Sequence, residues 1–156
     1  MYNTTTIGQR ILLTLWVGGL WTVGYIVTPT LFHVLDDRQL AGMLAGRLFG
    51  IMSYLGLACG LLLLATVLYQ ARQAWRGTWQ IWVLLLMLAL ISIGEFGLTS
   101  QMQALKATHP QGFIQGTEAA QRFGMLHGLS SSLYLATSLL GLALVIFGLE
   151  PKRSQP

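Results

Sequence analysis

One stretch of the sequence, from Arg122 to Leu135, places a histidine, three consecutive serines and a tyrosine inside an otherwise apolar segment. At about 100° per residue, His127, Ser131 and Tyr134 share one face of a helix. Polar groups in a hydrocarbon environment are costly, so such a stripe indicates either a binding site or hydrogen bonds that hold helices together. The sequence is consistent both with a binding site and with hydrogen bonds between helices.

Glu95 is the only acidic residue deep inside any of the long apolar segments. A carboxyl group at that depth is expected to face the interior of a helix bundle and find a partner, or to be protonated. We expect Glu95 to couple to His127, directly or through Ser131 or a water, because a carboxylate and an imidazole stabilise each other's charged forms. The alternative is a structural hydrogen bond from a neutral carboxyl group.

The first apolar segment adds Pro29 and His33, which share a helix face with Tyr25. Proline has no backbone N–H, so Pro29 leaves a carbonyl one turn earlier without its usual donor. A ligand could use that carbonyl, or the proline could simply kink a membrane helix. His33 is either a ligand-binding residue or a histidine at the membrane interface.

Arg47 lies near the start of the second apolar segment and completes the candidate set. With four spans, His33, Arg47, Glu95 and His127 all fall in the half of the bilayer farther from the chain termini. We therefore predict a polar pocket that opens on that side. The predicted ligand-binding residues are His127, Glu95, Ser131, Tyr134, His33 and Arg47.

The chemistry of these side chains suits a transition metal, because imidazole and carboxylate bind Zn and Cu. Met102 or Met125 would supply a soft donor for Cu(I). No His-x-x-x-His or Cys-x-x-Cys motif is present, so the metal and any other cofactor stay unspecified. Nothing resembles a nucleophilic triad or a phosphate loop, so we assign no catalytic residue and expect a role other than catalysis.

Membrane-spanning helices must position these residues. Of the 156 residues, 54% are hydrophobic and 9% are charged, whereas a typical soluble domain is roughly 25% charged. Four long stretches lack Asp, Glu, Lys and Arg, and about 20 mostly apolar residues suffice to cross a bilayer. The sequence therefore predicts an all-α fold, an integral membrane four-helix bundle in a single transmembrane domain. The predicted spans are about 7–33, 40–71, 79–104 and 119–149.

Basic residues predict the orientation in the membrane. Four spans put both termini on one side of the membrane. The basic residues expected on that side are Arg10, Arg72, Arg76, Lys152 and Arg153, and those expected on the other side are Arg38, Arg47, Lys106 and Arg122. Since Arg47 and Arg122 are expected at helix ends rather than in loops, the positive-inside rule favours the first group as cytoplasmic. We predict a multi-pass protein of the cell (inner) membrane with both termini in the cytoplasm. The net charge of +4 reflects these flanking residues, and no basic cluster indicates nucleic-acid binding.

Small residues in the second span predict how helices pack. Six of them fall within about 120° of one another on a helix: Gly42, Gly46, Gly50, Ser53, Gly56 and Gly60. In lipid, small residues at such spacing let helix backbones approach closely. We interpret this face as packing, within the chain, between two copies in a homo-oligomer, or against a larger membrane complex.

Several motifs run along the spans: "WVGG" and then "PTLF" in the first, "LFG" entering the second, and "RFGMLHGLSS" entering the fourth. With these motifs the chain resembles the transmembrane-protein-205-like family of small four-span membrane proteins, over nearly its whole length. The resemblance implies His127, Gly128, Ser130 and Ser131 as signature positions. The third span matches least, so Glu95 rests on the argument from its chemistry alone.

The pattern of the first span is also similar to the copper-resistance D type and to the membrane-embedded protoporphyrinogen oxidases, which use histidines near haem. That similarity implies a haem-linked redox protein, with His33 and His127 as ligands or proton carriers, as a third hypothesis. The first is a binding or transport-associated protein with an outward polar pocket. The second is a structural accessory subunit that packs on a larger complex.

Overall fold

A computed structural model describes residues 4–71, 76–109, 112–114 and 116–149. The elements are α1 (Thr4–Thr22), η1 (Val23–Val27), α2 (Thr28–Val34), α3 (Arg38–Ala71), α4 (Trp79–Ser92), η3 (Ile93–Thr99), α5 (Ser100–Thr108) and α6 (Glu118–Phe147). Consecutive elements join into four helical spans, Thr5–Val34, Arg38–Ala71, Trp79–Thr108 and Glu118–Phe147, each long and apolar enough to cross a membrane. Among the described residues there is no strand, so the prediction of an all-α four-helix membrane fold is confirmed. The protein is a multi-pass membrane protein whose apolar helices contact lipid.

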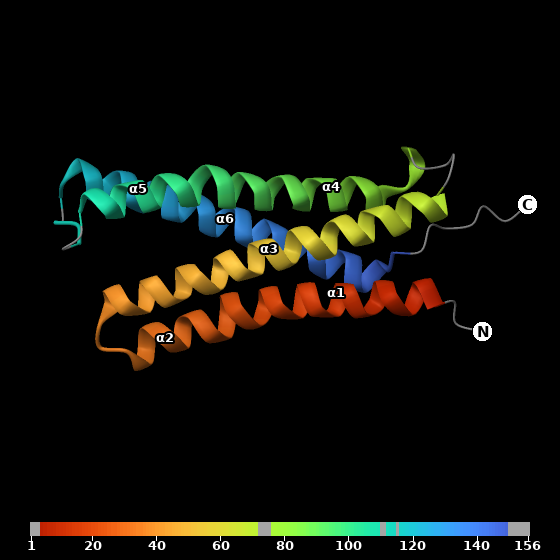
Figure 1. Cartoon of the computed structure of the whole chain (residues 1–156), viewed down its shortest axis with the longest axis horizontal. Helices are drawn as coiled ribbons and strands as arrows, with labels where there is room; N and C mark the ends of the chain where they lie inside the picture. The colour runs from red at the N-terminus through yellow and green to blue at the C-terminus, as the bar shows by residue number, and fades with distance from the viewer. Residues whose placement is uncertain (1–3, 72–75, 110–111, 115, 150–156) are drawn as a thin grey trace, which may run out of the picture.

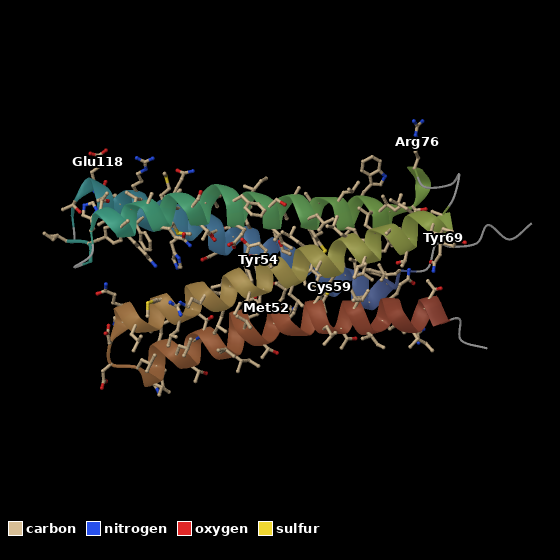
Figure 2. All side chains as sticks on the ribbon, viewed as in Figure 1. Met52, Tyr54, Cys59, Tyr69, Arg76 and Glu118 are labelled. Carbon is tan, nitrogen blue, oxygen red and sulfur yellow. The ribbon has the colours of Figure 1, made fainter. Side chains whose placement is uncertain are left out.

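The four spans run side by side in alternating directions (Figure 1). The start of α1 and the end of α6 lie at one end, which we call the terminal end. The turns that join α2 to α3 and α5 to α6 lie at the opposite end, the loop end. Of the basic residues that predict the orientation, Arg72, Lys152 and Arg153 lie outside the described residues. Figure 2 shows Arg76 at the terminal end and Glu118 at the loop end.

The hydrophobic core lies in the terminal half of the bundle. There α3 packs against α1 and α4, and α6 packs against α1 and α4. The largest fully buried side chains come from all four spans: Trp16, Leu63, Ile81, Leu84, Met87 and Leu144. Met52, also buried, points from α3 toward α1 (Figure 2). Side chains from all four spans therefore fill this half.

The loop half is packed differently. Here α2 contacts α3 and α5 contacts α6, and the two helical hairpins diverge toward the loop end (Figure 1). Neither α2 nor α5 has a buried side chain. Buried residues of this half are small or scattered, namely Ala41, Ala45, Leu98 and Leu126. The polar candidate residues therefore belong to the half of the bundle that has the smaller core.

Two glycines of α3 make the close contacts of the packed half. A Cβ added at Gly60 would lie 2.7 Å from Cδ2 of Leu88 and 3.0 Å from the ring of Trp16. One added at Gly56 would lie 2.6 Å from Nε1 of Trp16. A Cβ at Gly46 would meet nothing within 4 Å in the described chain. The small-residue face of α3 thus contacts α1 and α4 at its terminal end, whereas a Cβ at Gly46 would contact no other described helix.

We expect Gly60→Leu to destabilise the protein by about 1–3 kcal/mol, because the added atoms would overlap Leu88 and Trp16. The apparent melting temperature in detergent measures this effect. Gly18→Leu is the matched control, since Gly18 on α1 is exposed and has nothing within 4 Å of an added Cβ. Melting of the Gly60→Leu protein at the wild-type temperature would show that this contact is not tight.

Candidate functional site

Two spans contain a π-helical segment, η1 in the first and η3 in the third. Such segments are rare and occur frequently at functional sites. Pro29 accounts for η1, because a residue without N–H disturbs the backbone hydrogen bonds before it. The backbone N–H of Thr28 donates to the carbonyl of Val23, and the Thr28 hydroxyl donates to the same oxygen at 2.8 Å. In η3, Gly94 and Gly97 weaken the preference for a regular α-helix.

Tyr134 joins the fourth span to the first at the level of η1. Its hydroxyl donates a 2.6 Å hydrogen bond to the backbone carbonyl of Leu20. A side chain added at Gly24 would overlap the Tyr134 ring, which also lies 5.0 Å from the ring of Phe49 on α3. The Tyr25 ring is 6.3 Å away. The hydroxyl of Tyr134 is therefore occupied by a bond between helices.

Glu95 lies in η3 and faces α3. It is partly buried, and its Oε1 is 3.7 Å from the position of a Cβ added at Gly50, the residue after Phe49. Glu95 and Tyr134 thus approach consecutive residues of α3 from two different spans. Within the described chain Glu95 makes no hydrogen bond or ion pair. A carboxyl group inside a membrane span is expected to have a partner.

Arg47 lies on α3 one helical turn before Gly50, the residue that this carboxyl group faces. It precedes Gly50 by three residues, which places it about 4.5 Å nearer the loop end along α3 and on a neighbouring part of the helix surface. The Arg47 side chain is exposed, and it has no hydrogen bond or ion pair to any described residue. We call the region formed by Arg47, Gly50 and Glu95 the Glu95 site.

The other predicted residues lie outside the Glu95 site. The Ser131 hydroxyl donates to the carbonyl of His127 in its own helix at 2.9 Å. Both side chains are exposed, and so are His33, in the last turn of α2, and Gly128; Ser130 is partly buried. No hydrogen bond or ion pair joins Glu95 to His127 in the part of the chain that the structure describes. Their coupling stays a prediction and would need an intermediate group.

A row of aromatic rings explains the position of His127. Its ring stacks on Phe123 at 6.2 Å with an interplanar angle of 7°. Phe123 stacks in turn on Phe113 at 4.8 Å, and Phe113 lies 5.4 Å from His109. Lys106 Nζ is 5.4 Å from the centre of the Phe123 ring. This row connects α5 to α6 at the loop end.

The structure shows how the candidate ligands of a metal ion or a haem are arranged. The described residues contain no group of three His, Cys, Asp or Glu side chains that could hold a metal ion. Met102 is partly buried on α5, and Met125 is exposed on α6. No interaction links His33 to His127 in the described ranges. The structure instead places one partly buried carboxyl group, that of Glu95 in η3, against α3 at Gly50, one helical turn from Arg47 along α3.

The sequence did not predict the two π-helical segments. It also did not predict that Tyr134 packs against Phe49 or that Glu95 faces Gly50. Pro29 did signal a disturbed backbone in the first span. Gly94 and Gly97, on either side of Glu95, were the corresponding signal in the third. Neither signal predicts which residues of α3 lie opposite, because that depends on how the helices pack.

The fold and the position of the polar residues define a four-span, multi-pass membrane protein. Residues 11–111, more than half of the chain, match the family described as Domain of unknown function (DUF4149), and the chain belongs to that family. The matched range includes Arg47, Gly50 and Glu95 and ends before α6, so His127 and Tyr134 lie beyond it. Searches of curated proteins and of solved structures gave no match.

We expect Tyr134→Phe to lower stability by about 0.5–1.5 kcal/mol, the net contribution of a typical hydrogen bond, because the Leu20 carbonyl would lose its donor from α6. Thermal melting in detergent measures the change. Tyr25→Phe is the matched control, since the Tyr25 hydroxyl has no hydrogen bond to a described residue. If both variants melt alike, the bond between Tyr134 and Leu20 contributes nothing to stability.

Proposed function

We propose that the protein binds a polar ligand within the membrane at the Glu95 site, as a binding or transport-associated membrane protein. One observation carries this proposal: a partly buried carboxyl group, in a π-helical segment of a span, has no partner among the described residues. A charge removed from water is unfavourable unless it is paired. A bound ligand would supply that pairing, and Arg47 would add a second contact of opposite charge.

The uneven packing of the bundle supports the same proposal. The terminal half contains the large buried side chains, which would hold the spans in place while a ligand enters. The loop half has two diverging hairpins (Figure 1), and Glu95 lies in η3, directly before α5. A ligand that enters from the loop end would therefore reach Glu95 without disrupting the core.

The location in the cell is part of the proposal. We place the protein in the inner membrane with both termini in the cytoplasm, on the count of basic residues, so that the loop end faces outward. The resemblance to the transmembrane-protein-205-like family belongs to the proposal too. Its most specific motif, residues 122–131, lies outside the range that matches the family of unknown function.

A second candidate function is that of a structural subunit in an oligomer or a larger membrane complex. Gly46 on α3 favours it, because this glycine is exposed and has no neighbour in the described chain within 4 Å of an added Cβ. In lipid, an open glycine lets another helix approach closely. Under this hypothesis the protein would have a stable partner and the Glu95 site would be closed to water.

The access of water to the Glu95 site tests the proposal. In a Cys59→Ser background, we expect a cysteine introduced by Gly50→Cys to react with a charged, membrane-impermeant thiosulfonate reagent, because a thiol ionises readily only in contact with water. Position 50 has room for the side chain, since the added Cβ would be at ordinary contact distance from Glu95. Labelling in right-side-out and inverted vesicles reports the side from which the site opens.

Three further cysteine variants serve as controls. Gly112→Cys, in the turn between α5 and α6, should react from the loop side and thereby shows the orientation. Thr137→Cys, buried in the terminal half, and Gly18→Cys, exposed toward lipid, should stay unlabelled. If Gly50→Cys is as unreactive as Thr137→Cys from both sides, the Glu95 site is closed and the proposed function is wrong.

A further inference from the structure

We infer that the Glu95 site recognises a zwitterionic group, in which Glu95 binds a primary ammonium and Arg47 binds a phosphate or carboxylate a short distance away. This inference rests on the proposed function and names the chemical class of its ligand. Arg47 and Glu95 come from two different spans: the carboxyl group of Glu95 faces α3 at Gly50, and Arg47 lies one helical turn before Gly50 on α3.

The positions of Glu95 and Arg47 along α3 suit one small ligand. The carboxyl group of Glu95 lies against Gly50, and Arg47 begins one turn closer to the loop end on the same helix. Glycine at position 50 leaves the surface of α3 flat between them, so a ligand could touch both groups. No ion pair joins Arg47 to Glu95 among the described residues, so each group is free to bind a charge that the ligand brings.

The chemistry of each side chain specifies one half of the ligand. A guanidinium presents N–H groups in a planar fork that matches the oxygens of a phosphate or carboxylate. A carboxylate only accepts hydrogen bonds, and a primary ammonium offers three donors. A ligand with both groups pairs both side chains, whereas a simple cation or anion would pair only one of the two.

The nearby aromatic rings favour an ammonium that donates hydrogen bonds over a quaternary one. Quaternary ammonium groups are recognised by the faces of aromatic rings. The rings of Tyr25, Phe49 and Tyr134 pack on one another, and the Tyr134 hydroxyl is bonded to Leu20. On the other side of η3, Phe96 packs edge-on against Tyr54, which lies between α3 and η3 (Figure 2). We therefore expect hydrogen bonds from the ammonium group to Glu95 to contribute more to ligand recognition than contacts with aromatic rings.

Binding of O-phosphoethanolamine to the purified full chain tests the inference. With the protein in nanodiscs of phosphatidylglycerol and phosphatidylcholine, isothermal titration calorimetry should give at least tenfold tighter binding of O-phosphoethanolamine than of phosphocholine. Ethanolamine and inorganic phosphate, which each carry charge of only one sign, should also bind at least tenfold more weakly. Glu95→Gln and Arg47→Gln should each weaken the binding of O-phosphoethanolamine at least tenfold, and Arg38→Gln, which alters an arginine at the start of α3, should not change it.

The ligand's source is tested in parallel. If the zwitterion is a lipid headgroup, nanodiscs that contain phosphatidylethanolamine should raise the melting temperature of the wild type and not that of Glu95→Gln. Binding of the soluble compound or stabilisation by the lipid each supports the zwitterion class. The inference is overturned if neither occurs, or if phosphocholine or its lipid does equally well. It is also overturned if the effect survives both Glu95→Gln and Arg47→Gln.

This outcome is separable from that of the proposed function. If Gly50→Cys reacts with the impermeant reagent while no zwitterion binds, the site is open and only the ligand class is wrong. If Gly50→Cys does not react, the proposed function itself fails. Equal melting of the Glu95→Gln protein and the wild type without ligand shows that a loss of binding does not result from misfolding.

Discussion

The packing of Trp16 against two glycines of α3 is the contact on which the rest of the structure depends. The Trp16 side chain is fully buried, and its ring fits against Gly56 and Gly60, where only glycine leaves enough room. Leu88 of α4 meets Gly60 from the other side. Because this contact fixes α1, α3 and α4 relative to one another, it determines which residues face each other farther along the bundle.

Toward the loop end the same helices no longer share a large core. The π-helical segments η1 and η3 interrupt the first and third spans there, and the hairpins α2–α3 and α5–α6 separate (Figure 1). Tyr134 bridges the first and fourth spans at this level through the Leu20 carbonyl. At the same level Glu95 faces α3 at Gly50, and the part of the bundle toward the loop end has few buried apolar side chains. Tight packing of the terminal half thus leaves Glu95 next to the half with the smaller core.

The sequence predicts an all-α fold with four helices of membrane-spanning length because its apolar stretches are long and have few charges. It identifies Glu95 because a carboxyl group stands out in such a stretch. The positions of His127 and Tyr134 could not be derived in the same way, because a helix wheel shows which residues share a face and not what that face meets. His127 stacks on Phe123 of its own helix, whereas Tyr134 reaches the backbone of α1.

One half of the bundle is tightly packed, and we propose that the other half admits water around Glu95. Hydrogen–deuterium exchange of the protein in lipid nanodiscs, followed by mass spectrometry, tests it most directly, because backbone amides exchange where water reaches and helices open. We expect faster exchange in residues 41–50 and 93–99 than in residues 56–67 and 79–92. Equal protection of both halves would contradict it.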